Sequence, residues 1–222
     1  VSLATGAVEM GQGVHRKLRE VVCRAFSIDR ERVRLQPTGT ALVPNTSPTA
    51  ASTGTDLNGR AAELACRAVL QRLRETAAGE LGKAKPERVE IREEQVFYGG
   101  QPSSLTWGML VAAAYARRVS LSAQAHYATP GVHFDRAAEK GEPFAYHAWG
   151  TALCEVTLDC LRGTYVVEAV EAVHDLGPSL DAAADLGQAE GGIVQGAGWL
   201  TLEEVVHAAD GPAGLALAAA AT

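Results

Sequence analysis

The feature that most constrains this chain is the run at residues 44–59, which reads PNTSPTAASTGTDLNG. Prolines, glycines and small side chains fill the run, and a helical pattern follows it directly. Small side chains leave backbone amide groups accessible, and accessible amides ahead of a helix make a favourable site for an anion. The run therefore predicts an anion-binding loop at the start of a helix.

Two other segments have the same character. Residues 6–13 read GAVEMGQG and precede a second helical pattern, while residues 185–192 read DLGQAEGG. Together the three segments predict one binding site, or cradle, for a polar ligand, which we expect to be a phosphorylated cofactor. From these residues alone, a purely structural loop is an open alternative for each segment.

Composition narrows the class of protein. The 222 residues carry a formal net charge of −6, with 47% hydrophobic and 21% charged residues, which is typical of a globular protein with a substantial core. Scattered basic residues argue against a nucleic-acid surface, and no apolar run approaches the ~20 residues of a membrane span. The opening residues lack a signal-peptide pattern and an initiator Met, so we expect the chain to begin inside a larger protein.

The four cysteines contain no Cys-x-x-Cys pair. Each of them, Cys23, Cys66, Cys154 and Cys160, sits in an apolar pattern. We therefore expect buried free thiols in a cytoplasmic protein, and no metal or iron–sulfur site made by this chain alone.

Hydrophobic periodicity predicts interleaved helices and strands. The most clearly amphipathic helix covers 14–26, and a second is expected to begin with Thr55 or Asp56 as its N-cap and to run to about 73. Further elements are predicted as strands at 3–9, 31–36, 89–91, 95–98 and 119–127, a helix at 105–115, an exposed loop at 129–143, a hairpin of strands around 152–158 and 165–173, and a helix at 183–206. Without a regular βαβ repeat, the pattern favours an α+β fold with mostly antiparallel sheets and packed helices. Residues 1–207 are interpreted as a partial domain and residues 208–222 as a low-complexity tail.

The predicted last helix contains Gly187, Gly191, Gly192, Gly196 and Gly198. Each interior glycine costs about 1 kcal/mol relative to alanine. We therefore expect another backbone or a ligand to approach this helix closely.

These segments together resemble the molybdenum-binding subunit of xanthine dehydrogenases, in the xanthine oxidase family. The resemblance rests on residues 8–13, 43–59, 118–122, 145–150, 155–160 and 174–204, in the same order and at similar spacing. It covers roughly residues 5–207, which is about a third of such a subunit.

The resemblance implies a molybdopterin cofactor carrying molybdenum, with iron–sulfur clusters and FAD on partner domains. Gly11 and Gln12 match family residues beside the metal and cofactor. Residues Ala51, Ser52, Thr53 and Gly54 match the loop that holds the pterin and its phosphate, and Gln188 matches a side chain that hydrogen-bonds the cofactor. An uncharged amide offers both a donor and an acceptor to a pterin edge.

The sequence also departs from the family. Its only Gly-Glu-Pro, at 141–143, lies mid-chain in the wrong context, so the family's general base is not assigned to Glu142. The family's substrate-orienting residues lie upstream of this chain, and Gly54 stands where a hydroxyl residue is common. We therefore assign no catalytic residue and no metal ligand.

Several functions are compatible with this reading. In the first, the chain is part of a purine-oxidising molybdenum hydroxylase. Such an enzyme uses water as its oxygen source and passes electrons to iron–sulfur, FAD and NAD sites elsewhere. Its partners would be the rest of the molybdenum subunit and the iron–sulfur and FAD domains, in a dimeric enzyme. The alternatives are an aldehyde or N-heterocycle oxidoreductase of the same family, and a truncated non-catalytic fragment. The upstream sequence and the metal content separate these readings.

Overall fold

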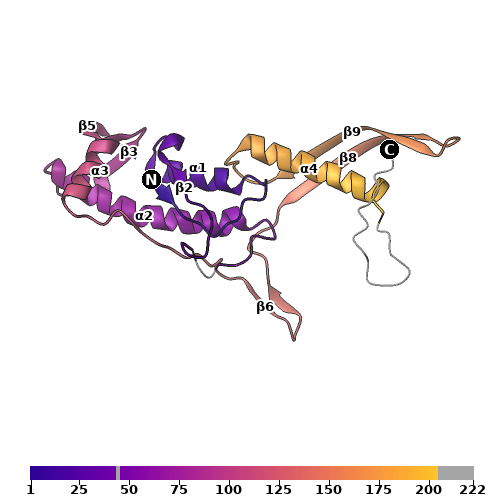
Figure 1. Cartoon of the computed structure of the whole chain (residues 1–222), viewed down its shortest axis with the longest axis horizontal. Coiled ribbons are helices and arrows are strands. Elements are labelled where there is room, and N and C mark those ends of the chain that lie inside the picture. The colour runs from indigo at the N-terminus through magenta and orange to yellow at the C-terminus, as the bar shows by residue number, and fades with distance from the viewer. Residues whose placement is uncertain (44–45, 205–222) are drawn as a thin grey trace.

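A computed structural model describes residues 1–43 and 46–204. The molecule is elongated, with a packed end that we call the body (residues 1–128) and a long projection that we call the arm (residues 149–204) (Figure 1). Helices combine with strand pairs that are mainly antiparallel, which confirms the predicted α+β class.

The body is built on three helices, α1 (Val14–Phe26), α2 (Gly54–Glu80) and α3 (Trp107–Ala116). The helical spacing of Val14, Leu18 and Val22 turns one face of α1 inward, where it packs against α2. The body also contains an antiparallel sheet of β3 (Val89–Arg92), β4 (Gln95–Tyr98) and β5 (Gln101–Thr106), which contacts α2 and α3. The main core includes Val22, Phe26, Val33, Leu73, Val89, Val96, Trp107 and Leu110.

Short elements connect these parts of the body. Strand β1 (Ser2–Leu3) pairs in parallel with β2 (Arg34–Leu35), which follows the 3-10 turn η1 (Arg30–Arg32). A second 3-10 turn, η2 (Pro86–Arg88), leads into β3. The small β1–β2 pair lies against α1 and leaves one edge of β1 without a neighbouring strand in the described residues.

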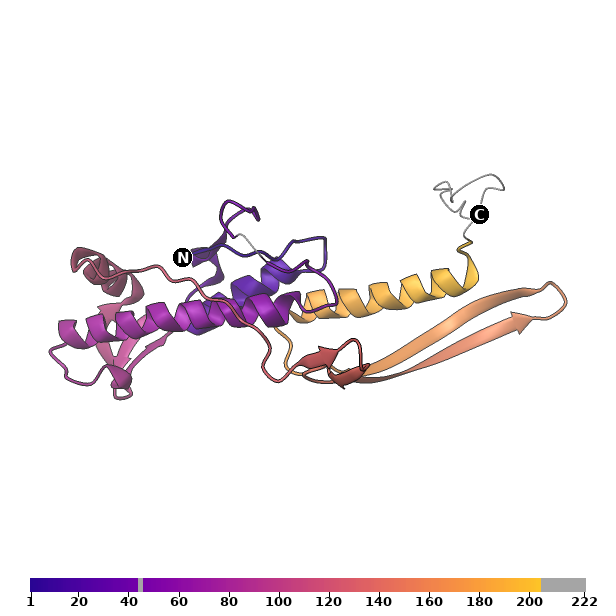
Figure 2. The same ribbon diagram turned by 90° about the horizontal axis from the view of Figure 1, so that it is seen from below.

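The arm consists of a long antiparallel hairpin, β8 (Trp149–Asp159) with β9 (Thr164–Asp175), followed by α4 (Ala182–Thr201). Figure 2 shows α4 extending away from the body roughly in line with α2. A smaller hairpin, β6 (His133–Asp135) with β7 (Lys140–Glu142), projects where 129–143 was predicted to be loop only. Across the described chain, no helix is both long and apolar enough for a membrane crossing.

Several predicted elements are wrong in extent. The strand predicted at 3–9 reduces to Ser2–Leu3, and the strand predicted at 119–127 is absent from the described structure because no neighbouring strand pairs with it. Helix α2 begins at Gly54, with Thr53 rather than Thr55 or Asp56 as its N-cap. The tail at 208–222 lies outside the described residues.

The cysteine prediction holds only in the body. Cys23 and Cys66 are buried, and burial raises the pKa of the Cys66 thiol to about 11. Cys154 and Cys160 are exposed on the hairpin, contrary to the prediction. An alternating apolar strand buries a face only when another layer covers it, and the described chain supplies no such layer here.

Candidate functional site

The first glycine-rich segment is organised by Glu9. Its carboxylate accepts hydrogen bonds from the backbone amides of Gly11 at 2.9 Å, Gly13 at 3.0 Å and His15 at 2.9 Å. Desolvation raises the pKa of Glu9, but these backbone hydrogen bonds outweigh it and hold the pKa below its ordinary value. Glu9 therefore fixes the entry to α1, where Gly13 adopts a left-handed conformation with φ of 79°.

Gln12 is also committed to this loop. Its Nε2 donates to the carbonyl of Val8 at 2.9 Å, and its Oε1 accepts from the amide of Met10 at 2.6 Å. A primary amide has two N–H donors, so one N–H of Gln12 stays available beyond the loop. The structure thus gives Gln12 a bracing role and leaves part of its side chain for a ligand.

The second segment ends in a tight turn at the start of α2. Ala51 and Ser52 have φ of 53° and 56°, and the amide of Thr53 donates to the carbonyl of Ala50 at 3.3 Å, which is the geometry of a type I′ turn. Thr53 makes no side-chain cap, so the first amides of α2 point outward without a capping side chain. The turn thus presents amides, together with the exposed residue Ser52, at the positive end of a 27-residue helix.

The N-termini of three helices, α1, α2 and α4, lie next to one another in the structure. A Cβ at Gly54 would lie 3.4 Å from Val14 of α1, and a Cβ at Gly13 would lie 3.1 Å from Ala184 of α4. The starts of α1, α2 and α4 are therefore neighbours. Glu9 already accepts hydrogen bonds from the amides that open α1, and Asp181 accepts one from Ala184 in α4, so the uncapped N-terminus of α2 is the one that favours an anion.

The loops that form this place are tied to one another. The amide of Val8 donates to Thr49 Oγ1 at 2.9 Å, and a Cβ at Gly6 would come within 2.5 Å of Thr46. Asn58 donates to the carbonyl of Gly54 at 3.1 Å and accepts from Thr5 Oγ1 at 3.1 Å. Sequence reasoning missed these supporting residues; the position of Asn58 four residues after Gly54 was the available signal for its contact.

The third segment joins the others only at its beginning. Asp181 caps α4 through the amide of Ala184 and forms an ion pair with Arg16 at 2.8 Å, and Asp185 pairs with Lys17. The Lys17 ammonium and then the Ser179 hydroxyl hold the pKa of Asp185 below its usual range. Gln188 lies further along α4 and is exposed.

The glycines of α4 are open in this structure. A Cβ at Gly187, Gly191, Gly192 or Gly196 would meet no described atom within 4 Å apart from the helix and chain neighbours. The close approach expected from the sequence is therefore not made by the described part of this chain.

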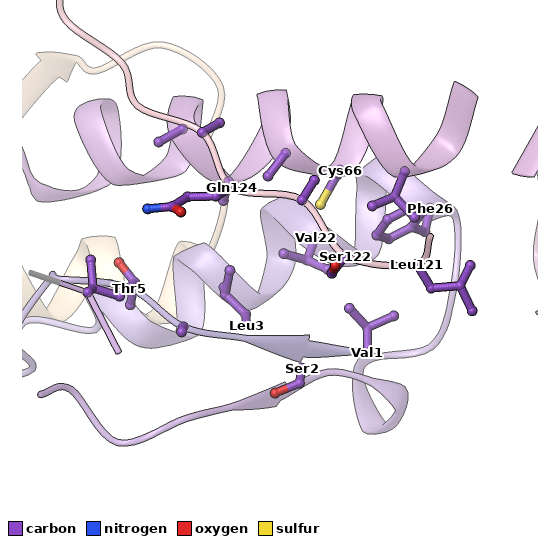
Figure 3. A pocket seen from close by; sticks show the side chains of 18 of the residues that line it. Val1, Ser2, Leu3, Thr5, Val22, Phe26, Cys66, Leu121, Ser122 and Gln124 are labelled. Atoms are coloured by element: carbon purple, nitrogen blue, oxygen red, sulfur yellow. The ribbon is translucent and has the colours of Figure 1, made fainter. Parts of the chain in front are cut away.

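A hollow in the body lies beside the cluster of helix N-termini and not in it. It measures about 680 Å³ and runs between β1 and residues 121–125 over a floor of α1 and α2 (Figure 3). None of the seven sequence-predicted cofactor residues lines it. Its apolar lining suits side chains and not an anion, so the amide-rich place at the three N-termini is the better candidate for the predicted cofactor.

The donors present fit an anionic pterin. The uncapped amides at the start of α2, the remaining N–H of Gln12 and the hydroxyl of Ser52 offer hydrogen-bond donors, and the carboxylate in the first turn of α2, Asp56, accepts a hydrogen bond from Tyr146. Gly11 has φ of 101° and open space around its Cβ position, so its backbone can approach a guest closely. In the described part of the chain, no group of three or more His, Cys, Asp or Glu side chains is arranged to hold a metal ion.

Comparison with known proteins identifies the family of this chain. Residues 1–215 match the family model of the molybdopterin cofactor-binding domain, and the chain belongs to that family. Xanthine dehydrogenase/oxidase of Felis catus is 40% identical over 211 residues, and aldehyde oxidase 2 of Cavia porcellus is 38% identical over 211 residues. Each match covers 95% of this chain and 14% of the relative, so the chain spans about one seventh of their length.

A solved structure shares the fold. The CO dehydrogenase of Oligotropha carboxidovorans superposes with a TM-score of 0.77 at 18% identity, covering 93% of this chain and 25% of that one. The likeness in fold thus extends over nearly all of this chain and a quarter of the solved one.

Proposed function

We propose that this chain forms part of the molybdopterin cradle of a molybdenum hydroxylase that oxidises a purine such as hypoxanthine or xanthine. The observation that carries the proposal is the uncapped N-terminus of α2, which lies beside the starts of α1 and α4. The family membership of the chain and its 40% identity to a xanthine dehydrogenase/oxidase support a purine as the substrate.

In this proposal, the chain's own residues bind and orient the cofactor. The amides of α2 and the hydroxyl of Ser52 hold its phosphate, while Glu9 keeps the Gly11–Gly13 backbone in place. Gln12 approaches the pterin from the loop before α1, and Gln188 approaches it from α4. When bound, the molybdenum centre supplies the redox chemistry that hydroxylates the substrate carbon with oxygen from water.

Other parts of the enzyme complete the reaction. We propose that the rest of the molybdenum subunit supplies the general base and the substrate-orienting residues, and that iron–sulfur and FAD domains carry the electrons onward in a dimeric, cytoplasmic enzyme. The chain alone is then expected to show no xanthine oxidation, because a general base contributes about 10²–10⁴-fold by itself. Measurable turnover of xanthine by the purified 222 residues would contradict this.

Ser52 gives the sharpest test of the cradle. The structure gives its hydroxyl no hydrogen-bond partner among the described residues, so Ser52→Ala should leave the stability of the fold unchanged within about 0.5 kcal/mol. In the longer enzyme that carries this chain, the variant should contain less molybdenum and pterin per protein.

Ser47→Ala is the matched control, since Ser47 is an exposed serine of the same loop. It should keep the wild-type molybdenum and pterin content. Equal content in Ser52→Ala, Ser47→Ala and wild type would place the phosphate elsewhere.

An aldehyde or N-heterocycle is the second candidate substrate, favoured by the 38% identity to aldehyde oxidase 2 over the same length. Turnover of xanthine, benzaldehyde and quinoline by the longer enzyme separates the candidates. The purine proposal requires the highest kcat/KM with xanthine or hypoxanthine, and a higher value with either other compound contradicts it.

A further inference from the structure

Among the described residues, no strand pairs with the edge of β1 that borders the hollow between β1 and residues 121–125. The carbonyls of Val1 and Leu3 accept hydrogen bonds from the amides of Arg34 in β2 and of Gln36 just after it, at 2.9 and 2.8 Å. Alternate residues of a strand point their backbone groups to opposite sides, so Ser2 and Ala4 direct theirs away from β2. Both line the hollow.

The opposite wall is a segment whose sequence predicts a strand. Residues 119–127 alternate strictly, with Val119, Leu121, Ala123, Ala125 and Tyr127 separated by polar side chains. The segment nevertheless forms no strand.

This segment is held in place on the body without a strand partner. Val119 and Leu121 pack against the main core, and Arg72 of α2 donates to the carbonyl of Ser122 at 2.9 Å. Figure 3 shows this segment on one side of the hollow and β1 on the other.

The space between the two walls has the size and lining of a strand site. Five lining residues, 121–125, correspond to about 17 Å of extended chain, which is an ordinary strand length. The floor is apolar and small, with Ala61, Ala62 and Ala65 of α2 beside Val22 and Phe26 of α1. Small floor residues leave room for the side chains of an inserted strand.

We propose that an extended strand of the same polypeptide, from outside these 222 residues, inserts between β1 and residues 121–125. It pairs with the free edge of β1 and with 121–125, and it turns the predicted strand at 119–127 into a real one. The occupant is assigned to the same polypeptide because the chain spans only 14% of its relatives' length, leaving most of such a protein to supply the strand. Its inward side chains are apolar, to match the floor. This inference is independent of the cofactor.

Hydrogen exchange of backbone amides tests the proposal. The exchange rates at Ser2, Ala4 and 121–125 are compared between the 222-residue chain and the longer protein that carries it. Exchange at Ser2, at Ala4 and at alternate residues of 121–125 should be at least about 100-fold slower in the longer protein, because hydrogen bonds to the inserted strand protect the amides that face it.

Two variants of α2 sharpen the test. Ala65→Phe places a ring in the hollow and should abolish the protection in the longer protein. Ala68→Phe, on the exposed face of the same helix, should leave it intact. Unchanged thermal unfolding of both variants in the 222-residue chain verifies that α2 still folds.

Three outcomes overturn the proposal. Equally fast exchange of these amides in both proteins means that no strand is present. Protection in the short chain that grows with its concentration assigns the hollow to a second copy. An apolar small molecule that co-purifies in the hollow of the longer protein, with the amides unprotected, assigns it to a ligand.

Discussion

The body and the arm have similar apolar patterns in sequence, but their apolar side chains are buried in the body and exposed in the arm. In the body, Leu18, Leu73 and Leu110 are almost completely buried. In the arm, Leu153 is 68% exposed, and Trp149 and Trp199 are 73% and 74% exposed. The two tryptophans are thus not the core residues that their size alone favours.

The difference teaches that burial depends on a second layer and not on the apolar pattern itself. The helices of the body cover one another, whereas both faces of the β8–β9 hairpin stand open. Exposed apolar surface on this scale is typical of an interface. We therefore interpret the arm as a surface that the rest of a longer protein covers, consistent with the one-seventh coverage of its relatives.

A pair of leucine truncations gives the largest expected contrast. Leu73→Ala, in the core of the body, should lower the free energy of unfolding of the 222-residue chain by about 2–5 kcal/mol, because it leaves a cavity. Leu153→Ala, in the open hairpin, should change it by less than about 0.5 kcal/mol. Chemical denaturation measures both values, and a comparable loss from Leu153→Ala would show that the hairpin is already covered in this chain.

Glu9 tests how the body organises the candidate site. Its lowered pKa in the folded state means that it contributes stability above its unfolded pKa, near 4.5, and that this contribution is lost as the pH falls through the lower folded value. Glu9→Gln should cost about 1–2 kcal/mol at pH 7, because charge-assisted hydrogen bonds to three amides are weakened.

The same variant should lose less stability than wild type between pH 5 and pH 3, since its amide does not titrate. Denaturation midpoints at several pH values supply the measurement. Wild-type and Glu9→Gln curves that run parallel through this range would assign the acid sensitivity to other carboxylates.

The smallest effect concerns Gly192 of α4. Because its Cβ position is open, Gly192→Ala should stabilise the 222-residue chain by up to about 1 kcal/mol through helix propensity. In the longer protein, where we expect another layer or the cofactor to meet α4, the same methyl should cost about 1–3 kcal/mol. Denaturation midpoints in both proteins give the sign, and stabilisation in the longer protein would remove the packing reason for these glycines.

The seven predicted cofactor residues remain predictions, but their arrangement is now defined. Local sequence pointed to Gly11, Gln12 and the 51–54 loop, because glycines and small residues ahead of helical patterns are typical of anion-binding loops. It could not show that the Gln12 amide hydrogen-bonds to the backbone of Val8 and Met10. Nor could it show that Thr49 and Asn58 hold the loops together. Those contacts join residues whose separation along the chain, up to 53 positions, gives no periodic signal.

The sequence by itself determined the elements whose stabilisation is local. The helix at 14–26 and the hairpin at 149–175 follow from the 3.6-residue and two-residue periods and from the turn at 161–163. Tertiary structure decided everything that needs a distant partner. Residues 119–127 have the strand pattern but no neighbour to pair with, Cys154 has the core pattern but no covering layer, and the start of α4 reaches α1 through the Arg16–Asp181 and Lys17–Asp185 pairs, which join residues far apart along the chain. The hydrophobic period of a segment determines which side chains share a face. Which element covers that face depends on packing between segments far apart along the chain.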